Sequence, residues 1–340
     1  RVGVSLCQCL AGATAMQVSA YVGLRARGVA GALVAYVGFG LPAFLFICAL
    51  SMAYVASKDL EPVLAVLAGL KLVVTALICH AAVDFARGFL RCGLDRLLAL
   101  AAGIWLGLGW HPIPALVGAM LVAMFMGQDP VAPPASLVSA QKASPATPTQ
   151  RRRWVSALGG AYWGSLVLIV GLLAVGLAAL YAVDQGLFDL AVLMARIDAF
   201  AFGGGYVSLP LMLHEVTVAR SWMSPAVFMD GIALGHVTPG PVVMSAAFVG
   251  YVVKGLAGAL VAGVYVFSPS FLVLLAAVPF VDRLLASKLM QRALHGSLVT
   301  LVGLMAAMTA RFALAVDGSP WAAGIAVAAF VALRAGADVL

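Results

Sequence analysis

The hexapeptide Ala-Gly-Ala-Leu-Val-Ala occurs twice in this chain, at Ala30–Ala35 and at Ala257–Ala262. At the same offset of 227 residues the identity extends outward, through the pairs Gly28 and Gly255, Ala20 and Ala247, Val22 and Val249, Pro42 and Pro269, and Phe44 and Phe271. With one residue of slippage, Gly12 pairs with Gly240 and Met16 with Met244. The sequence therefore predicts two copies of one structural unit, and any fold must accommodate both.

The repeat lies in a chain that is too apolar for a soluble domain. Of its 340 residues, 64% are hydrophobic and only 10% are charged, whereas soluble proteins carry about 25% charged residues. Its long apolar stretches approach the ~20 residues that span a bilayer as a helix, and they lack the alternation of an outer-membrane barrel. This predicts an all-α polytopic membrane protein. Duplicated membrane halves are typical of secondary transporters, whose substrate site lies between the repeats.

The apolar segments divide the chain into two repeats joined by a linker. We expect eleven of them, at residues 4–24, 28–55, 62–86, 94–110, 112–127, 155–181, 187–207, 226–251, 256–281, 293–316 and 320–338. The stretch 128–154 is rich in Pro, Ala, Ser and Thr, which is typical of a flexible linker. The predicted domains are an N-terminal repeat at 1–127, the linker at 128–154 and a C-terminal repeat at 155–340. The first copy lacks the helix that precedes the Gly-Pro region of the second, so we expect its start to be truncated.

Threading these segments alternately across a membrane sorts the basic residues by side. One side receives fourteen of them: Arg25, Arg27, Arg87, Arg91, Arg96, Lys142, Arg151, Arg152, Arg153, Arg220, Arg283, Lys288, Arg292 and Arg334. The other side receives only Lys58, Lys254 and Arg311. An excess of Lys and Arg marks the cytoplasmic side, so the linker and the C-terminus are predicted to be cytoplasmic in a bacterial inner membrane. Segments 4–24 and 226–251 then run in opposite directions, which predicts inverted-topology repeats.

Two segments of the second half are too broken for plain membrane helices. One contains Gly203-Gly204-Gly205, and each glycine weakens a helix by about 1 kcal/mol. The other is the run from His236 through Val237 and Thr238 to Pro239-Gly240-Pro241, in which two prolines remove amide donors and end the helical hydrogen-bond ladder. Freed backbone at membrane depth is tolerated only inside the protein or along a water-filled cavity. We expect re-entrant or broken helices here, and a half-helix beginning near Pro241 would offer N–H groups and a positive dipole end to an anion. A simple proline kink is the alternative.

These motifs resemble those of the chromate ion transporter family. The resemblance rests on FGGGY at 202–206, His214-Glu215, ALGHVTPGP at 233–241, AAFVGY at 246–251, GLAGALVA at 255–262 and SPSF at 268–271, and on CQCLAGATAMQ at 7–17 and YVGLRARGVAGALVAYVGFGLPAF at 21–44. It covers nearly the whole chain and implies a two-domain, long-chain transporter that exports chromate and so confers chromate resistance. Sulfate is the look-alike anion. The first copy has Ala11-Gly12-Ala13 where the family pattern has Pro-Gly-Pro, which favours a smoother helix there.

Charged groups within the apolar segments add further candidates. Arg196 leads into the glycines and is a candidate for attracting the anion, while Asp198 must face other neighbours. His236 is either a donor or proton relay or a structural hydrogen-bond partner. The candidate substrate-binding residues are thus Gly12, Arg196, Gly203, Gly204, Gly205, His236, Thr238, Pro239, Gly240 and Pro241. The helical spacing of four polar residues in segment 62–86 predicts either one hydrogen-bonded string or an ion pair of Asp84 with Arg87. The four residues are Lys71, His80, Asp84 and Arg87.

Other classes of function find little support in the sequence. The chain has no phosphate-binding loop and no recognisable nucleophile, so we expect neither an enzyme nor a bound cofactor. Its five cysteines lack the spacing of a metal site. Its basic residues are dispersed between apolar segments, which argues against nucleic acid as a partner. The expected partners are chromate, sulfate and the lipid bilayer, with a homodimer left open. The rival functions are a transporter for sulfate or another oxyanion and a channel or non-transporting membrane scaffold.

Overall fold

The computed structural model describes residues 7, 10–57, 60–126, 159–202, 204–315 and 320–334. Within these residues the chain is almost wholly helical, and the one β-type pairing is an isolated bridge between Ala11 and Phe202. By length and composition, five helical stretches can cross a membrane: Thr14–Ser57, Glu61–Phe89, Gly160–Val183, Val242–Phe280 and Lys288–Ala315. The predicted class, an all-α polytopic membrane protein, is confirmed.

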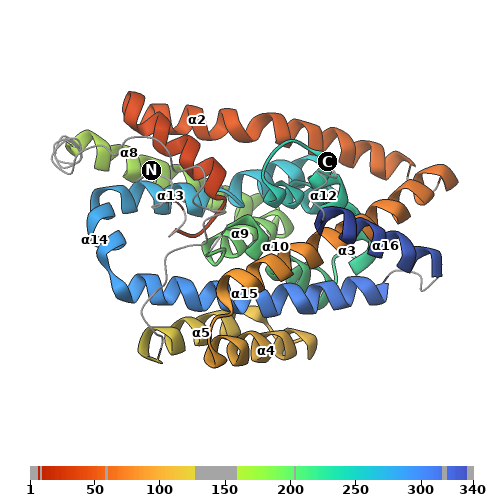
Figure 1. Ribbon diagram of the computed structural model, residues 1–340. Helices are drawn as coiled ribbons and strands as arrows, with labels where there is room; N and C mark the ends of the chain where they lie inside the picture. Colours follow the sequence, from red (N-terminus) through yellow and green to blue (C-terminus); the bar gives the residue numbers. More distant parts are fainter. Residues whose placement is uncertain are drawn as a thin grey trace.

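The helices follow the predicted segments closely in the first half and are more divided in the second (Figure 1). Before the linker they are α2 (Thr14–Ser57), α3 (Glu61–Phe89), α4 (Gly93–Gly107) and α5 (Pro112–Met126). After it come α8 (Gly160–Val183), α9 (Gln185–Ala199), α10 (Gly205–Leu213), the π-helical turn η1 (His214–Ala219), α11 (Pro225–Val237), the 3-10 turn η2 (Val242–Met244), α12 (Ser245–Tyr265), α13 (Ser268–Ala277), the 3-10 turn η3 (Val278–Phe280), α14 (Val281–Ala286), α15 (Lys288–Ala315) and α16 (Pro320–Arg334).

The repeated sequence folds into the same sharp turn in both halves. In α2 the helix is interrupted at Gly28, with φ 65° and ψ −154°, and in α12 it is interrupted at Gly255, with φ 61° and ψ −151°. A positive φ of this kind is open to glycine and disfavoured for residues with a Cβ. The identical glycines of the two copies therefore produce identical turns.

Each of these turns reverses the chain, so α2 and α12 are hairpins of two helical arms. A Cβ added at Gly23 would lie 2.2 Å from the carbonyl oxygen of Gly31, and one added at Gly250 would lie 2.2 Å from that of Gly258. Residues eight apart in a straight helix are about 12 Å apart along its axis, so the arms must fold back on each other. The predicted boundaries between 4–24 and 28–55, and between 226–251 and 256–281, are confirmed.

The two halves run in opposite directions where they meet. The rings of Tyr36 and Phe271 have centroids 4.8 Å apart, and a Cβ added at Gly263 would lie 2.8 Å from the ring of Phe44. Residue numbers rise along the second arm of α2 while they fall along its partner, so these equivalent segments are antiparallel. This is the inverted arrangement that the sequence predicts.

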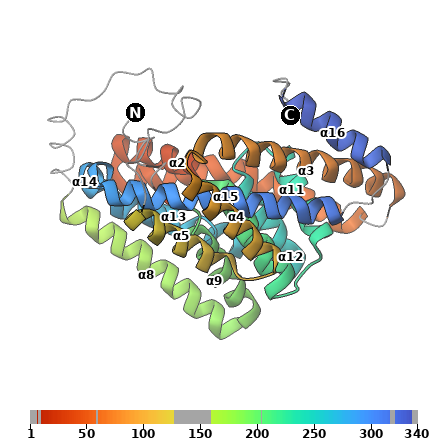
Figure 2. The ribbon, with the colours of Figure 1, turned by 60° about the horizontal axis from the view of Figure 1, so that its bottom comes forward.

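Helices of the two halves interleave instead of forming two separate bodies. The α4 helix packs on α15, and their repeat equivalents α16 and α3 pack on each other. The first contact is close, since a Cβ added at Gly303 would lie 1.9 Å from the carbonyl oxygen of Ala99. Figure 2 shows α4 and α5 lying over α15 with α8 at the edge of the molecule. The division into domains at 127 and 155 stays a prediction.

The threading treated segment 226–251 as one broken helix that crosses the membrane. The structure corrects this, because the segment reverses its direction. A Cβ added at Gly231 would lie 2.3 Å from the ring of Phe248, and one added at Gly235 would lie 3.3 Å from Cβ of Ser245. The α11 helix and the first arm of α12 are therefore antiparallel, and the chain reverses at Pro239–Pro241. Two prolines end the hydrogen-bond ladder, but packing decides the direction in which the chain leaves the break.

The segment that contains α9 and α10 reverses in the same way. Arg196 on α9 forms an ion pair with Glu215 in η1, 19 residues later, whereas a straight helix would separate them by about 28 Å. The two hairpins, α9 with α10 and α11 with the first arm of α12, each begin and end on the same side of the molecule. The ion pair of Lys254 with Asp184, at 2.9 Å, lies on that side. Arg220, which the threading placed on the opposite side, therefore lies on the side of Lys254. Lys58, Lys142 and Arg151, Arg152 and Arg153 of the linker lie outside the described residues, and the side of the other basic residues stays a prediction.

Candidate functional site

Three helix N-termini converge near the middle of the molecule, where the broken segments meet. They are the starts of α2 at Thr14, of α10 at Gly205 and of η2 with α12 at Val242. A Cβ added at Gly204 would lie 3.8 Å from Oγ1 of Thr14, and one added at Gly205 would lie 2.8 Å from a methyl group of Val243. No side chain caps α10, η2 or α12. Uncapped N–H groups and three positive dipole ends thus face a common region.

The break of the first half pairs with the glycine break of the second. Ala11 bridges Phe202 in an antiparallel manner, and the N–H of Gly12 donates to the carbonyl of Ala201 at 2.9 Å. Gly12 has φ 110°, and the helix begins only at Thr14. The smoother helix expected at Ala11-Gly12-Ala13 is therefore wrong, because the pairing with Ala201 and Phe202 holds this backbone in a non-helical conformation even without prolines.

Each broken segment also touches the other half at equivalent places. A Cβ added at Gly12 would lie 2.1 Å from Cβ of Ser270, and one added at Gly240 would lie 2.4 Å from Cβ of Ala43. Ser270 and Ala43 occupy the same position of the repeat, next to Pro269 and Pro42. The two contacts are therefore related by the pseudo-symmetry, and a movement of one half against the other must alter both.

His236, beside the break at Pro239-Gly240-Pro241, has one ring nitrogen without a hydrogen-bond partner in the described part of the chain. Nδ1 of His236 donates to the carbonyl of Ile232 at 2.9 Å, while its Nε2 is buried without a hydrogen-bond partner among the described residues. The ring lies 6.5 Å from that of Tyr206 on α10.

Thr238 is buried, and its hydroxyl donates to the carbonyl of Gly235 at 2.9 Å. Pro239 and Gly240 are exposed and Pro241 is half-buried, so the break is accessible. Gly203 lies outside the described residues.

Sequence reasoning missed two hydroxyl groups at this convergence. Ser245 begins α12 and Ser208 lies in α10, and both hydroxyls are buried without a partner in the described chain. A serine four residues after Pro241 was the available signal, because a polar side chain in the first turn after a membrane break can face the site. The half-buried Thr14, at the start of α2, brings a further hydroxyl close to Gly204.

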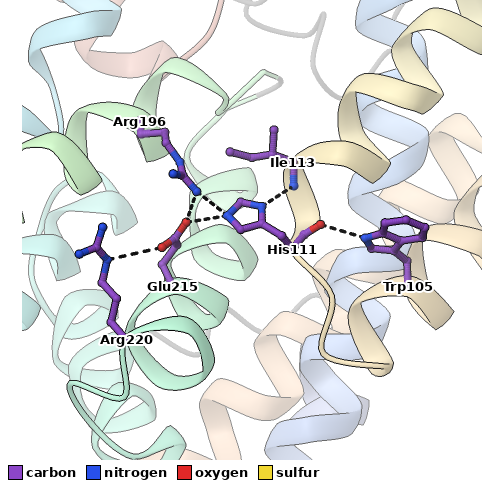
Figure 3. A network of polar contacts seen from close by, with 6 residues as sticks. All are labelled: Trp105, His111, Ile113, Arg196, Glu215 and Arg220. Carbon is purple, nitrogen blue, oxygen red and sulfur yellow. Dashed lines mark hydrogen bonds and ion pairs between the residues drawn. The ribbon is translucent and has the colours of Figure 1, made fainter.

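Arg196 belongs to a separate polar network, in which it faces Glu215 and His111 (Figure 3). The carboxylate of Glu215 has a side-chain exposure of 6% and also lies 2.7 Å from Nε2 of His111 and 3.6 Å from Nε of Arg220. The N–H of Ile113 donates to Nδ1 of His111, while Nε2 of the ring contacts both Glu215 and Arg196. The network joins the α4–α5 turn of the first half to the π-helical turn of the second. A role of Arg196 in anion binding stays a prediction.

The polar residues of α3 form only one link of the predicted string, between His80 and Asp84. Lys71 pairs with Asp230 of α11 at 3.1 Å. His80 contacts Asp84 at 3.2 Å, and Asp84 pairs with Arg334 of α16 at 3.3 Å. Asp84 thus pairs with Arg334 and not with Arg87 as expected, which places the end of α16 beside the end of α3. The pairs Lys71 with Asp230 and Asp84 with Arg334 join the two halves.

A cavity of about 350 Å³ lies beside the breaks, between α2, α8, α12 and α13. Met16 and Met244, which are equivalent residues of the repeat, line it with Tyr36, Phe44 and Phe271. Its walls are apolar, so it offers an anion no replacement for the water that the anion would lose. The convergent helix N-termini remain the better candidate site.

Comparison with known proteins identifies the family. The model of the family described as chromate transporter matches residues 2–127 and 188–338. The chain belongs to the chromate transporter family. An uncharacterized transporter of Methanocaldococcus jannaschii is 37% identical over 332 residues, which cover 97% of this chain and 79% of that protein. The chromate transport protein of Pseudomonas aeruginosa is 32% identical over 317 residues, or 90% of this chain and 69% of that protein.

A further member of the family, the chromate transport protein of Cupriavidus metallidurans, is 27% identical over 294 residues, or 83% of this chain and 64% of that protein. No solved structure matches the fold. Membership of this family supports a role in chromate transport, and it agrees with the prediction that the chain is a transporter and not an enzyme.

Proposed function

We propose that the chain is a secondary transporter that exports chromate across the bacterial inner membrane and thereby confers chromate resistance. The observation that carries the proposal is the meeting of three helix N-termini, at Thr14, Gly205 and Val242, between two inverted repeats. A dianion in a site of low polarity needs hydrogen-bond donors and positive dipole ends, and unwound re-entrant segments supply both.

The substrate oxygens are proposed to accept from backbone N–H groups at the glycine break and after Pro241. His236 supplies a further donor when its free Nε2 is protonated, and the hydroxyls of Ser245 and Thr14 lie at two of the converging helix starts. Gly12, Gly240 and Thr238 shape the break: Gly12 and Gly240 approach the opposite half closely, and Thr238 turns its hydroxyl to Gly235. These assignments rest on geometry and on the chemistry of the anion.

Alternating access is the proposed mechanism. The contacts of Gly12 with Ser270 and of Gly240 with Ala43 are equivalent under the inverted repeat, so rocking of one half against the other can tighten one contact while it opens the other. A membrane potential that is negative inside favours the exit of a dianion by about 2 × 2.3 kcal/mol per 100 mV.

Sulfate is the second candidate substrate, because it is also a tetrahedral dianion and the site offers donors to oxygen atoms of either ion. We expect inverted membrane vesicles that contain the chain to take up labelled chromate with saturable kinetics, with competition by sulfate and little by chloride. Vesicles without the chain are the control. Equal competition by chloride would contradict an oxyanion site, and a flux that rises linearly with concentration would favour a channel instead of a carrier.

The proposed orientation places the linker, Arg25, Arg27 and the C-terminal end in the cytoplasm. Because the segments around Pro241 and Gly204 reverse, we expect Ser221, which is exposed before α11, to face the periplasm. In intact cells a membrane-impermeant maleimide should label Ser221→Cys well above the parent chain. Ser287→Cys, between α14 and α15, should react only after permeabilisation. An absence of labelling at 221 in intact cells would overturn the re-entrant orientation.

A further inference from the structure

Asp198 is a fully buried carboxyl group with an incomplete set of partners. It lies near the end of α9 with an exposed fraction of 0%, beside the broken segment of the first half. Its Oδ2 accepts the backbone N–H of Ser270 at 2.6 Å. Its Oδ1 is buried and has no hydrogen-bond partner in the described parts of the chain.

The groups that face Asp198 carry no positive charge. A Cβ added at Gly12 would lie 3.1 Å from its Oδ1. Ser270 of α13 holds the hydroxyl of Tyr36 at 2.8 Å, and Gln17 of α2 donates to the carbonyl of Ser270 at 3.2 Å. Tyr36 and Cys7 are the titratable neighbours on this side. Among the described residues no Lys, Arg or His side chain forms a contact with Asp198.

The neighbouring cation on the same helix is already engaged. Arg196 lies two residues before Asp198, faces another direction and pairs with Glu215. An ionised carboxylate that is buried with hydrogen bonds from Ser270 alone and no counter-charge is costly. A proton on Oδ1 removes that cost.

We propose that Asp198 is the proton-carrying group of this transporter, and that the proton and the anion bind together; this rests on the proposed function. The ionised carboxylate beside Gly12 would repel a dianion at the adjacent helix N-termini, whereas the neutral acid leaves their dipoles unopposed. Binding of one ligand therefore strengthens binding of the other by the same factor. One proton enters the carboxyl as the anion binds and leaves it when the anion is released, so one net negative charge crosses with each chromate instead of two.

Binding of sulfate to the purified full chain in lipid nanodiscs tests this inference. Sulfate is the probe because it stays a dianion over the whole range, whereas chromate itself takes up a proton near neutrality. In potassium buffers between about pH 6 and about pH 9, the affinity should fall with rising pH, with a limiting slope of about tenfold per unit for one linked proton. A pH-indicator dye in weakly buffered solution should record proton uptake when sulfate is added at the alkaline end.

The matched variants separate Asp198 from other titrating groups. Asp198→Asn, which still accepts from Ser270 and mimics the neutral acid, should lose the greater part of the pH slope and of the proton uptake, and any slope that remains belongs to His236. Asp189→Asn, an exposed position of the same helix, should retain the slope of the wild type. Where Asp198→Asn does not fold, the dye measurement is made on His236→Gln, in which retained proton uptake assigns the proton to Asp198 and lost uptake assigns it to the imidazole.

Four results would overturn the inference. If the wild type binds sulfate without pH dependence or proton uptake, the inference is wrong and the proposed function stands. An unchanged slope in Asp198→Asn would place the proton elsewhere, and a requirement for sodium in place of protons would make the group a cation ligand instead. If the wild type binds neither sulfate nor chromate, the proposed function falls and this inference with it.

Discussion

Replacement of Gly12 by alanine is expected to reduce chromate transport by about tenfold or more. The new Cβ would lie 2.1 Å from Cβ and 2.8 Å from Oγ of Ser270, and alanine is strained at φ 110°. Such strain alone costs on the order of 1–3 kcal/mol, and each 1.4 kcal/mol is a factor of ten in an equilibrium constant. The break must move away from α13, which opens the pairing of Gly12 with Ala201 at the centre of the site.

The measurement is vesicle uptake at matched protein content, with Gly38→Ala as the control. Gly38 lies on the second arm of α2, and a Cβ added there would meet no atom within 4 Å. We expect Gly38→Ala to transport at the wild-type rate. Normal transport by Gly12→Ala, with the protein inserted at wild-type levels, would show that this close contact is not needed for the transport cycle.

Replacement of Glu215 by glutamine is expected to give the largest loss of stability. The carboxylate is 6% exposed and faces Arg196, Arg220 and His111 from both halves. Loss of one partner from a buried ion pair costs about 3–5 kcal/mol, because it leaves the other charge without compensation. Arg196 and Arg220 keep side-chain exposures of 43% and 29%, so water offsets part of the loss and we expect about 3 kcal/mol, the lower end.

Thermal unfolding of the purified protein in detergent measures this effect. We expect the apparent Tm of Glu215→Gln to fall by on the order of 5 °C. The exposed acid at the start of α3 offers a matched change, and Glu61→Gln should leave Tm unchanged. Arg196→Gln should be milder than Glu215→Gln, because Glu215 keeps His111 and Arg220. If Glu215→Gln is as stable as Glu61→Gln, the network does not hold the two halves together.

The repeat predicted much of the fold because its signals are local. Gly28 and Gly255 fix a turn by their own backbone conformation, so equal residues at equal places gave equal hairpins. The directions taken after Pro241 and after Gly204 were not predictable. They depend on contacts such as Gly231 with Phe248 and Arg196 with Glu215, which join residues whose proximity no spacing in the sequence reveals.

The candidate site was predictable as a set of breaks but not as an arrangement. Glycines and prolines at membrane depth identified Gly204, Gly240 and Gly12, since such residues weaken or end helices wherever they lie. Their convergence depends on the way in which the inverted halves interlock. The same limit explains Asp198 and Glu215, whose different surroundings follow from helix packing and not from their neighbours in the chain.

Locating bound chromium would show whether the anion binds where the three helix N-termini meet. Crystals of the protein soaked in chromate, measured at the chromium absorption edge, give an anomalous difference map of its position. The account predicts a peak between Thr14, Gly204 and Val242. A peak beside Arg196 and Arg220, with none at the breaks, would contradict it.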